Sequence, residues 1–245
     1  MTSEGFSVDK LKKSPANPDG PTAAPTPGDW QPPPELPLDD PTDLLLVASR
    51  LGCQALYVPT EGRETAVNAQ RSQHKLAVLN ALSGPSAEIR LLAMSGYSYL
   101  APRGTFFIAL EAALRRGVRV EVVLEAAAVK NPVMTPKEIE TRLAKLAQAH
   151  EGFRQLRRRY HNKLELREFP APVPATMLIT PQVCFFEPYI YPSAHIRESH
   201  LLVAFEMVFD TQIASHGHEL MSKFFDLAFR RSAPTDDPTA DDGAD

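Results

Sequence analysis

The segment from Ile89 to Leu124 constrains the fold more than any other part of the chain. Ile89–Met94 is a short apolar run, which is typical of a buried strand. Thr105–Arg116 then carries apolar residues at helical spacing, Gly117 marks the end of that helix, and Val118–Leu124 is rich in β-branched residues. Because two strands joined by a crossover helix pair in parallel, this segment predicts an α/β fold.

Similar patterns predict the remaining helices and strands. The expected helices cover 44–56, 64–82, 135–160 and 212–230, and the expected strands cover 164–169, 176–179, 183–186 and 201–208. The two middle strands are separated by Pro181-Gln182, which predicts a hairpin. The last helix is expected to bury six side chains: Leu220, Met221, Phe224, Phe225, Leu227 and Ala228.

Composition separates two tails from this domain. Ten of the 23 prolines lie between Pro15 and Pro41, so residues 1–41 are expected to form a disordered arm that binds a protein partner. Residues 232–245 hold five aspartates and no large apolar side chain, which predicts a disordered acidic tail. The folded domain is therefore expected to span 42–231.

The charge balance limits the classes of partner that the chain is expected to bind. The formal net charge is -4, from 26 Lys and Arg against 30 Asp and Glu, which argues against broad electrostatic binding of nucleic acid or of an anionic membrane. The apolar runs are too short to span a bilayer, and residues 1–40 hold no apolar signal region. We expect a cytoplasmic protein.

The order of these segments, with several local strings, resembles the phospholipase D-like family over about Glu88–Arg230. The strings are IRLLAMSG, ALRRGVRVEVVLE, LELREFP, TMLITPQVCFFEP and ELMSKFFDLAF. The arrangement is most similar to the degenerate domains of this type that are attached to some bacterial regulators. The resemblance implies a mixed sheet flanked by helices, a regulatory role and a homodimer that pairs about a two-fold axis.

Active members of that family carry a His-x-Lys-x4-Asp motif, which this chain lacks. At the matching positions stand Val173, Ala175 and Thr180, and Glu187-Pro188 replaces the usual Gly-Ser-x-Asn. None of these side chains supplies the nucleophile or the phosphate-binding cation of the family. The resemblance therefore implies a non-catalytic sensor or interaction module, a pseudoenzyme that needs no metal or other cofactor.

One alternative interpretation is that the chain is an enzyme. His161 and Lys163 are followed at the family's spacing by Glu168, which gives His-x-Lys-x4-Glu. A divergent phosphodiesterase or nuclease would need these three side chains to converge beside loops of small residues. The simpler interpretation is a polar helix end followed by an ordinary strand.

A ligand site is expected where the first strand of the parallel pair ends. Ser95, Tyr97 and Tyr99 follow that strand, and Arg103 precedes the next helix. Ligands of parallel α/β sheets bind outside the carboxyl ends of the strands, and small residues there permit close approach. His195 and Arg197 are further candidates on a later loop.

Two other groups of residues suggest different partners. The arginines within Arg154–Arg159 form the main basic cluster, and a nucleic-acid-binding accessory protein would use them. The pairs His195/His200 and His216/His218 have no Cys, Asp or Glu at a usual ligand spacing, so no metal site is expected.

Overall fold

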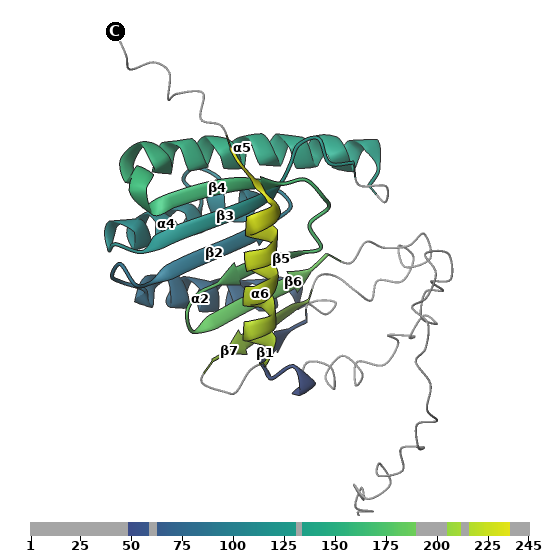
Figure 1. Ribbon diagram of the computed structural model, residues 1–245. Coiled ribbons are helices and arrows are strands. Elements are labelled where there is room, and N and C mark those ends of the chain that lie inside the picture. Colours follow the sequence, from purple (N-terminus) through teal and green to yellow (C-terminus); the bar gives the residue numbers. More distant parts are fainter. Residues whose placement is uncertain (1–48, 59–62, 131–133, 190–204, 212–215, 236–245) are drawn as a thin grey trace, which may run out of the picture. The chain divides into compact units, whose positions relative to one another are not determined.

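A computed structural model describes residues 49–58, 63–130, 134–189, 205–211 and 216–235. The strands of this part form one sheet of eight in the order β1-β7-β6-β5-β2-β3-β4-β8 (Figure 1). The strands are β1 (Cys53–Tyr57), β2 (Glu88–Ala93), β3 (Arg119–Glu125), β4 (Leu164–Phe169), β5 (Ala175–Ile179), β6 (Val183–Pro188), β7 (Glu206–Asp210) and β8 (Ala233–Pro234). The helices are α2 (Glu64–Ala81), α3 (Tyr97–Leu100), α4 (Thr105–Arg115), α5 (Pro136–Tyr160), the 3-10 turn η2 (His161–Lys163) and α6 (His216–Arg231).

The sheet is mixed. β2 pairs with β3 in parallel, and β3 pairs with β4 in parallel, whereas the other neighbours are antiparallel. The predicted strand–helix–strand unit is confirmed, with Ile89 opposite Val120 in the register. The predicted hairpin is also confirmed, since β5 and β6 pair across Pro181 and Gln182. The expected fold class, a mixed sheet flanked by helices, is therefore confirmed.

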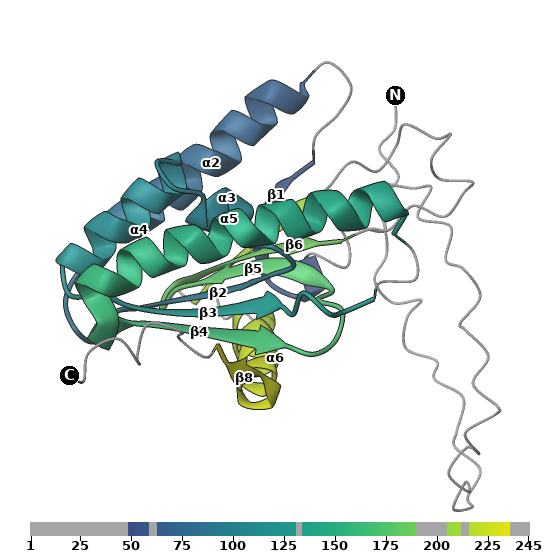
Figure 2. The same ribbon diagram turned by 90° about the horizontal axis from the view of Figure 1, so that it is seen from above.

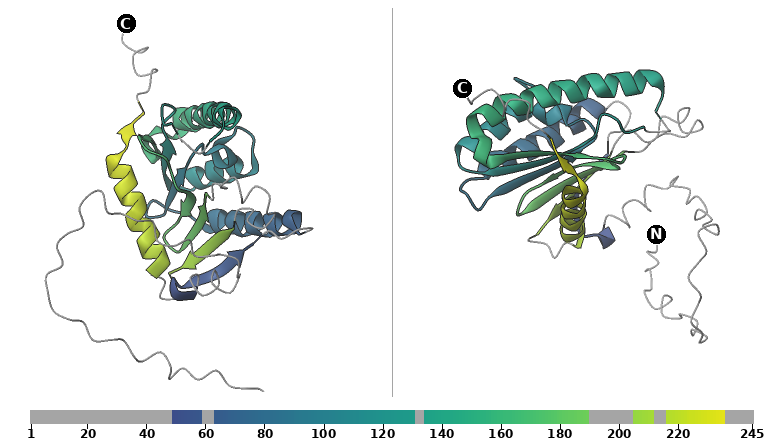
Figure 3. Two further views of the ribbon diagram at one scale, coloured as in Figure 1. Left: turned by 90° about the vertical axis from the view of Figure 1, so that its right-hand side faces the viewer. Right: turned by 45° about the horizontal axis from the view of Figure 1, so that its top comes forward.

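Helices cover the two faces of the sheet unequally. α2, α3, α4 and α5 lie on one face, and α6 lies on the opposite face (Figure 2). Figure 3 shows α6 crossing its face of the sheet without a second described helix beside it. α5 begins where the sequence predicts, because Thr135 and Glu138 form a reciprocal capping box and Pro136 occupies the first turn.

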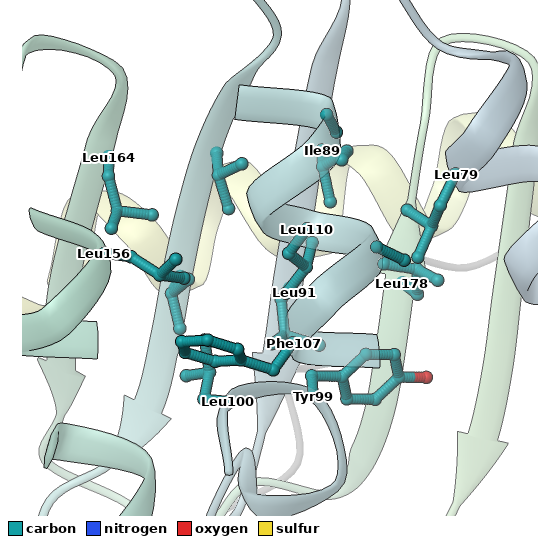
Figure 4. Close-up of a cluster of buried hydrophobic side chains, with 14 of the residues drawn as sticks. Leu79, Ile89, Leu91, Tyr99, Leu100, Phe107, Leu110, Leu156, Leu164 and Leu178 are labelled. Atoms are coloured by element: carbon teal, nitrogen blue, oxygen red, sulfur yellow. The ribbon is translucent and has the colours of Figure 1, made fainter. Parts of the chain in front are cut away.

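Two buried clusters fill the space between these layers. The larger cluster lies under α2, α4 and α5, and its members in Figure 4 include Leu79, Leu110 and Leu156 with Leu91 of β2. The smaller cluster lies under α6 and is built around Phe225. Because side chains alternate along a strand, each central strand contributes to both clusters.

The structure corrects the helix expected over 44–56. Residues 53–57 form strand β1, which pairs antiparallel with β7, and 44–48 lie outside the described residues. The apolar pattern fits either element, and the unpaired edge of β7 decides between them, because backbone hydrogen bonds to a sheet edge outweigh a weak helix preference. Of the strand expected over 201–208, only 205–208 is described; the observed strand β7 extends to Asp210.

α6 buries less than the sequence predicts. Phe225 and Ala228 are buried, but Leu220, Phe224 and Leu227 are 51%, 36% and 40% exposed. All three exposed residues lie on the outer side of the helix, which no other described element covers. The expectation that these three belong to the core is wrong.

The ordered sheet extends beyond the predicted domain end at residue 231. Ala233 and Pro234 form the two-residue strand β8, which pairs antiparallel with β4. Two further contacts hold the segment: Ser232 Oγ donates to the carbonyl of Ala228 at 2.7 Å, and Thr235 Oγ1 donates to that of Leu166 at 3.2 Å. The first residues of the expected acidic tail thus belong to the domain.

Candidate functional site

A cavity of about 770 Å³ opens at the carboxyl end of β2. This volume lies within the range of about 300–1,000 Å³ that is common for small-molecule sites. Its wall is made by the strand end and α3, by α2, by the start of α5, and by β5 and β6. The residues are Arg71, Ser72, Lys75, Ala93, Met94, Ser95, Gly96, Tyr97, Ser98, Tyr99, Phe106, Met134, Thr135, Lys137, Glu138, Thr141, Arg142, Lys145, Thr176, Glu187 and Tyr189.

Three of the predicted ligand residues line this cavity, namely Ser95, Tyr97 and Tyr99. The strand turns sharply into α3 through Gly96, whose φ of 63° is in the region that favours glycine. Arg103 does not line the cavity and is exposed on the loop after α3. His195 and Arg197 lie outside the described residues.

Lys75 and Glu206 form a buried ion pair at the cavity wall. Lys75 lines the cavity from α2, and Glu206 is the first residue of β7. Burial lowers the pKa of Lys75, but Tyr99 and Glu206 oppose this and the net direction is upward, so Lys75 is an ammonium at neutral pH. In the described part of the chain, Glu206 Oε1 has no hydrogen-bond partner.

Tyr99 lies at the end of the larger buried cluster, next to this ion pair. Figure 4 shows its hydroxyl oxygen pointing away from Phe107 and the other labelled side chains. The Lys75 ammonium is 5.7 Å from the centre of the Tyr99 ring and 5.8 Å from that of Phe185. Burial raises the pKa of Tyr99, so its hydroxyl stays protonated and is able to donate a hydrogen bond.

A second buried ion pair, Arg142 with Glu125, fixes the wall on the side of α5. Arg142 Nη1 donates to Glu125 Oε1 at 2.9 Å, and Arg142 Nη2 donates to the carbonyls of Ala127 and Val129 at 3.0 and 3.2 Å. Glu125 Oε2 accepts from the backbone N–H of Val173 at 2.8 Å. This pair therefore joins α5, the segment after β3 and the start of β5.

Polar contacts also hold the opposite wall. Arg71 Nη1 of α2 donates to Glu187 Oε1 of β6 at 3.3 Å. Tyr189 Oη lies 2.6 Å from Thr176 Oγ1, and it accepts from the backbone N–H of Met94 at 3.2 Å. The ends of β2, β5 and β6 are thus tied together around the cavity.

Sequence reasoning missed the charged residues of the cavity. Lys75 carried a usable signal, since it stands four residues before the buried Leu79 on the inner side of α2. Its partner Glu206 is 131 residues further along the chain (206 − 75 = 131). No local pattern connects two residues so far apart.

The positions of the family motif face away from the cavity. Val173 and Ala175 are fully buried in the cluster under α6, whereas Thr176 lines the cavity on the other face of β5. Thr180 Oγ1 donates to the carbonyl of Val183 at 3.0 Å inside the hairpin. None of these three motif positions presents a reactive group to a substrate.

The alternative catalytic set does not converge. Lys163 directly precedes β4 and donates to the carbonyl of Leu114, and the exposed His161 lies two residues before it. Glu168 is near the other end of β4, where His150 Nε2 lies 3.5 Å from Glu168 Oε1. Five strand residues span about 16 Å, so Lys163 and Glu168 lie at opposite ends of β4.

Two further candidate sites also have structural partners. In the basic cluster, Arg154 pairs with Glu151 and Arg159 pairs with Glu111, each at 2.7 Å. His218 Nε2 lies 2.9 Å from the carbonyl oxygen of Thr180. Within the described ranges, no group of three or more His, Cys, Asp or Glu side chains is placed to hold a metal ion. No helix in the same ranges is long and apolar enough to cross a membrane.

Comparisons with known proteins give similar structures only at low identity. No protein-family model matches the chain, and no curated protein matches it. It is similar to the archaeal chromatin protein TrmBL2, at 16% identity and a TM-score of 0.43, over 80% of this chain and 61% of that one. It is similar to Nuc, a phospholipase D family member from Salmonella typhimurium, at 16% identity and a TM-score of 0.37, over 68% of this chain and 91% of that one.

A third similar structure is phosphatidylserine synthase from Haemophilus influenzae, at 12% identity and a TM-score of 0.42. That match covers 74% of this chain and 38% of that one. At these low values the similarities carry no weight for function, which has to come from the site itself.

Proposed function

We propose that this chain is a non-catalytic, phospholipase D-like ligand-binding module with a regulatory role. The observation that carries the proposal is the cavity at the carboxyl end of β2, which is large enough for a small molecule and is lined by Ser95, Tyr97 and Tyr99. Its walls are held by two buried ion pairs rather than by apolar packing alone. A cavity whose wall combines polar and apolar side chains suits recognition of a ligand.

Among the described residues, neither the motif positions nor the alternative set places a nucleophile beside a cation, which supports binding over catalysis. Phosphodiester cleavage on a protein side chain needs a nucleophile and a cation within reach of one phosphorus atom. Val173 and Ala175 face the cluster under α6, and Lys163 and Glu168 lie at opposite ends of β4. These placements support a module that binds a ligand and leaves it unchanged.

The first test separates binding from hydrolysis. We expect the full chain to leave bis(p-nitrophenyl) phosphate intact, with the same background rate for wild type and for His161→Ala. Hydrolysis that is lost in His161→Ala would overturn the proposal and would make the alternative set the active site.

The second test places binding in the cavity. The neutral fluorophore N-phenyl-1-naphthylamine is expected to bind the wild type and to be excluded by Ser98→Trp, because Ser98 is exposed but lines the cavity. Gln148→Trp is the matched control, since Gln148 is exposed on α5 and outside the lining. Equal binding to both variants would contradict a ligand site at this position.

The homodimer and the partner-binding arm of residues 1–41 stay predictions from the sequence. Sedimentation equilibrium of the full chain tests the first, with a mass of twice 27.0 kDa expected for a dimer. Removal of residues 1–41 is expected to leave binding of the fluorophore unchanged, because the cavity is built from other residues, so any partner that the shortened chain no longer binds would be assigned to the arm.

A further inference from the structure

The cavity has more positive than negative side chains in its wall. Its cations are Arg71, Lys75, Lys137, Arg142 and Lys145, and its carboxylates are Glu138 and Glu187. Even with the two buried partners behind the wall, Glu125 and Glu206, the cations outnumber the carboxylates by five to four. A cavity with this balance favours a ligand of negative charge.

Two of these cations have no carboxylate partner in the described part of the chain. Arg71, Lys75 and Arg142 each pair with a glutamate. Lys137 and Lys145 form no ion pair with a described residue. They stand eight residues apart on α5 and line the same wall, with Thr141 between them.

Charge near the start of α5 also supports an anion at this wall. Arg142 is 3% exposed and belongs to the wall, and its charge is balanced by Glu125 behind the wall, so it is not counted as a free donor. The first turn of the 25-residue helix α5 lies at the same wall and adds a partial positive charge.

The rest of the wall suits a flat organic body. Tyr97 and Phe106 present aromatic rings, and Met94 and Met134 add thioethers that adapt to irregular shapes. These side chains line the same cavity as the cations. A ligand with an aromatic or ring-shaped body and one anionic group would satisfy both parts of the wall.

We propose that the cavity binds a small organic oxyanion, a phosphate ester or a carboxylate. Its anionic group lies against Lys137, Lys145 and the first turns of α5, and its ring lies against Tyr97 and Phe106. This inference rests on the proposed ligand-binding function and names the class of ligand. Phosphate and carboxylate share the chemistry that these donors recognise.

A matched pair of fluorophores tests the charge directly. 1-Anilinonaphthalene-8-sulfonate and N-phenyl-1-naphthylamine share one aromatic body, and only the first carries a sulfonate. The anionic probe is expected to bind the full chain about tenfold more tightly, and Lys145→Gln is expected to weaken it about fivefold while changing the neutral probe by less than about twofold. Lys130→Gln is the control, since Lys130 is exposed and outside the cavity.

Competition then distinguishes the two ligand sources. Glucose 6-phosphate and glucuronate each carry one anionic group on a sugar ring, and glucose carries none. Displacement of the anionic probe by either anion, but not by glucose, supports the proposal and identifies the preferred oxyanion. Equal displacement by glucose would show that charge is not recognised.

Two results separate this inference from the function on which it rests. If the anionic probe binds no more tightly than the neutral one, and both are excluded by Ser98→Trp, the oxyanion inference fails and the ligand site stands. If Ser98→Trp excludes neither probe, the ligand site and the inference both fail.

Discussion

Lys75 and Glu206 pair inside the protein, where their residues are only 5% and 1% exposed, beside the ring of Tyr99. The pair links α2 to the first residue of β7, so it connects the cavity wall to the outer strands of the sheet. A buried charge that loses its partner is strongly destabilising, whereas replacing both charges by apolar groups is tolerated.

The first prediction follows from this pair. Lys75→Met is expected to lower the free energy of unfolding by about 3–5 kcal/mol, because it leaves the Glu206 carboxylate buried and alone. The double variant Lys75→Met, Glu206→Met is expected to recover much of that loss, as measured by urea unfolding. Lys223→Met removes an exposed pair with Glu219 and is expected to leave stability unchanged. A double variant as unstable as the single one would show that the pair is not the cause.

The second prediction concerns pH. Burial and the neighbouring Glu88 raise the pKa of Glu121 to about 7, although Arg90 and Arg119 oppose the shift. The folded state therefore holds a proton that the unfolded state has lost, so stability falls as the pH rises from about 4.5 to about 7. We expect Glu121→Gln to remove about 1 kcal/mol of the difference in unfolding free energy between pH 5 and pH 7.5.

Comparing wild type with Glu121→Gln isolates the contribution of the Glu121 carboxyl to the pH dependence of stability. Other groups with raised pKa values, such as Glu125, contribute to the slope in both proteins and cancel. Arg90, which lies beside Glu121, also pairs with Asp226 of α6: Arg90 Nη1 is 3.2 Å from Asp226 Oδ1. Identical pH slopes for wild type and Glu121→Gln would contradict the assignment.

The third prediction compares two adjacent phenylalanines of α6. Phe225 is fully buried and Phe224 is 36% exposed. Phe225→Ala is expected to cost about 3–5 kcal/mol of unfolding free energy, because it opens a cavity under the helix. Phe224→Ala is expected to cost less than about 1 kcal/mol. Equal losses in thermal and urea unfolding would mean that another chain or segment covers the outer side of α6.

The fourth prediction tests the contact between α5 and α3. A Cβ on Gly152 would lie 1.7 Å from the backbone oxygen of Leu100, so the two helices cross with no room for a side chain. Gly152→Ala is expected to lower the free energy of unfolding by about 1–3 kcal/mol or more, although alanine is the better helix former. Because Leu100 ends α3, the same variant is expected to weaken binding of the anionic fluorophore. Increased stability would show that α3 and α5 are further apart.

The parts of the fold that sequence predicts well are those with local signals. Thr135 and Pro136 predict the start of α5, and the helix begins there, with Thr135 as its N-cap. The carboxyl end of a parallel strand is a common ligand position, which is the basis for predicting Ser95, Tyr97 and Tyr99; all three line the cavity, and their contact with a ligand stays a prediction. In each case the determining residues lie within a few positions of one another.

The parts that sequence misses depend on distant contacts. Strand β1 pairs with β7, about 150 residues away along the chain, and its own apolar pattern fits a helix equally well. The Lys75–Glu206 pair depends on α2 packing beside β7, which no local spacing reveals. Helical spacing assigns Leu220 and Leu227 to the core, but spacing alone does not tell how much of a helix the sheet covers.

The most direct test of the account is a backbone amide chemical-shift titration of the full chain with 1-anilinonaphthalene-8-sulfonate. The account predicts that the largest shifts fall in two segments of the cavity wall, 95–99 and 135–145, and that Lys145→Gln reduces them. Shifts confined to α6, or no saturable shifts at the end of β2, would contradict a ligand site in this cavity.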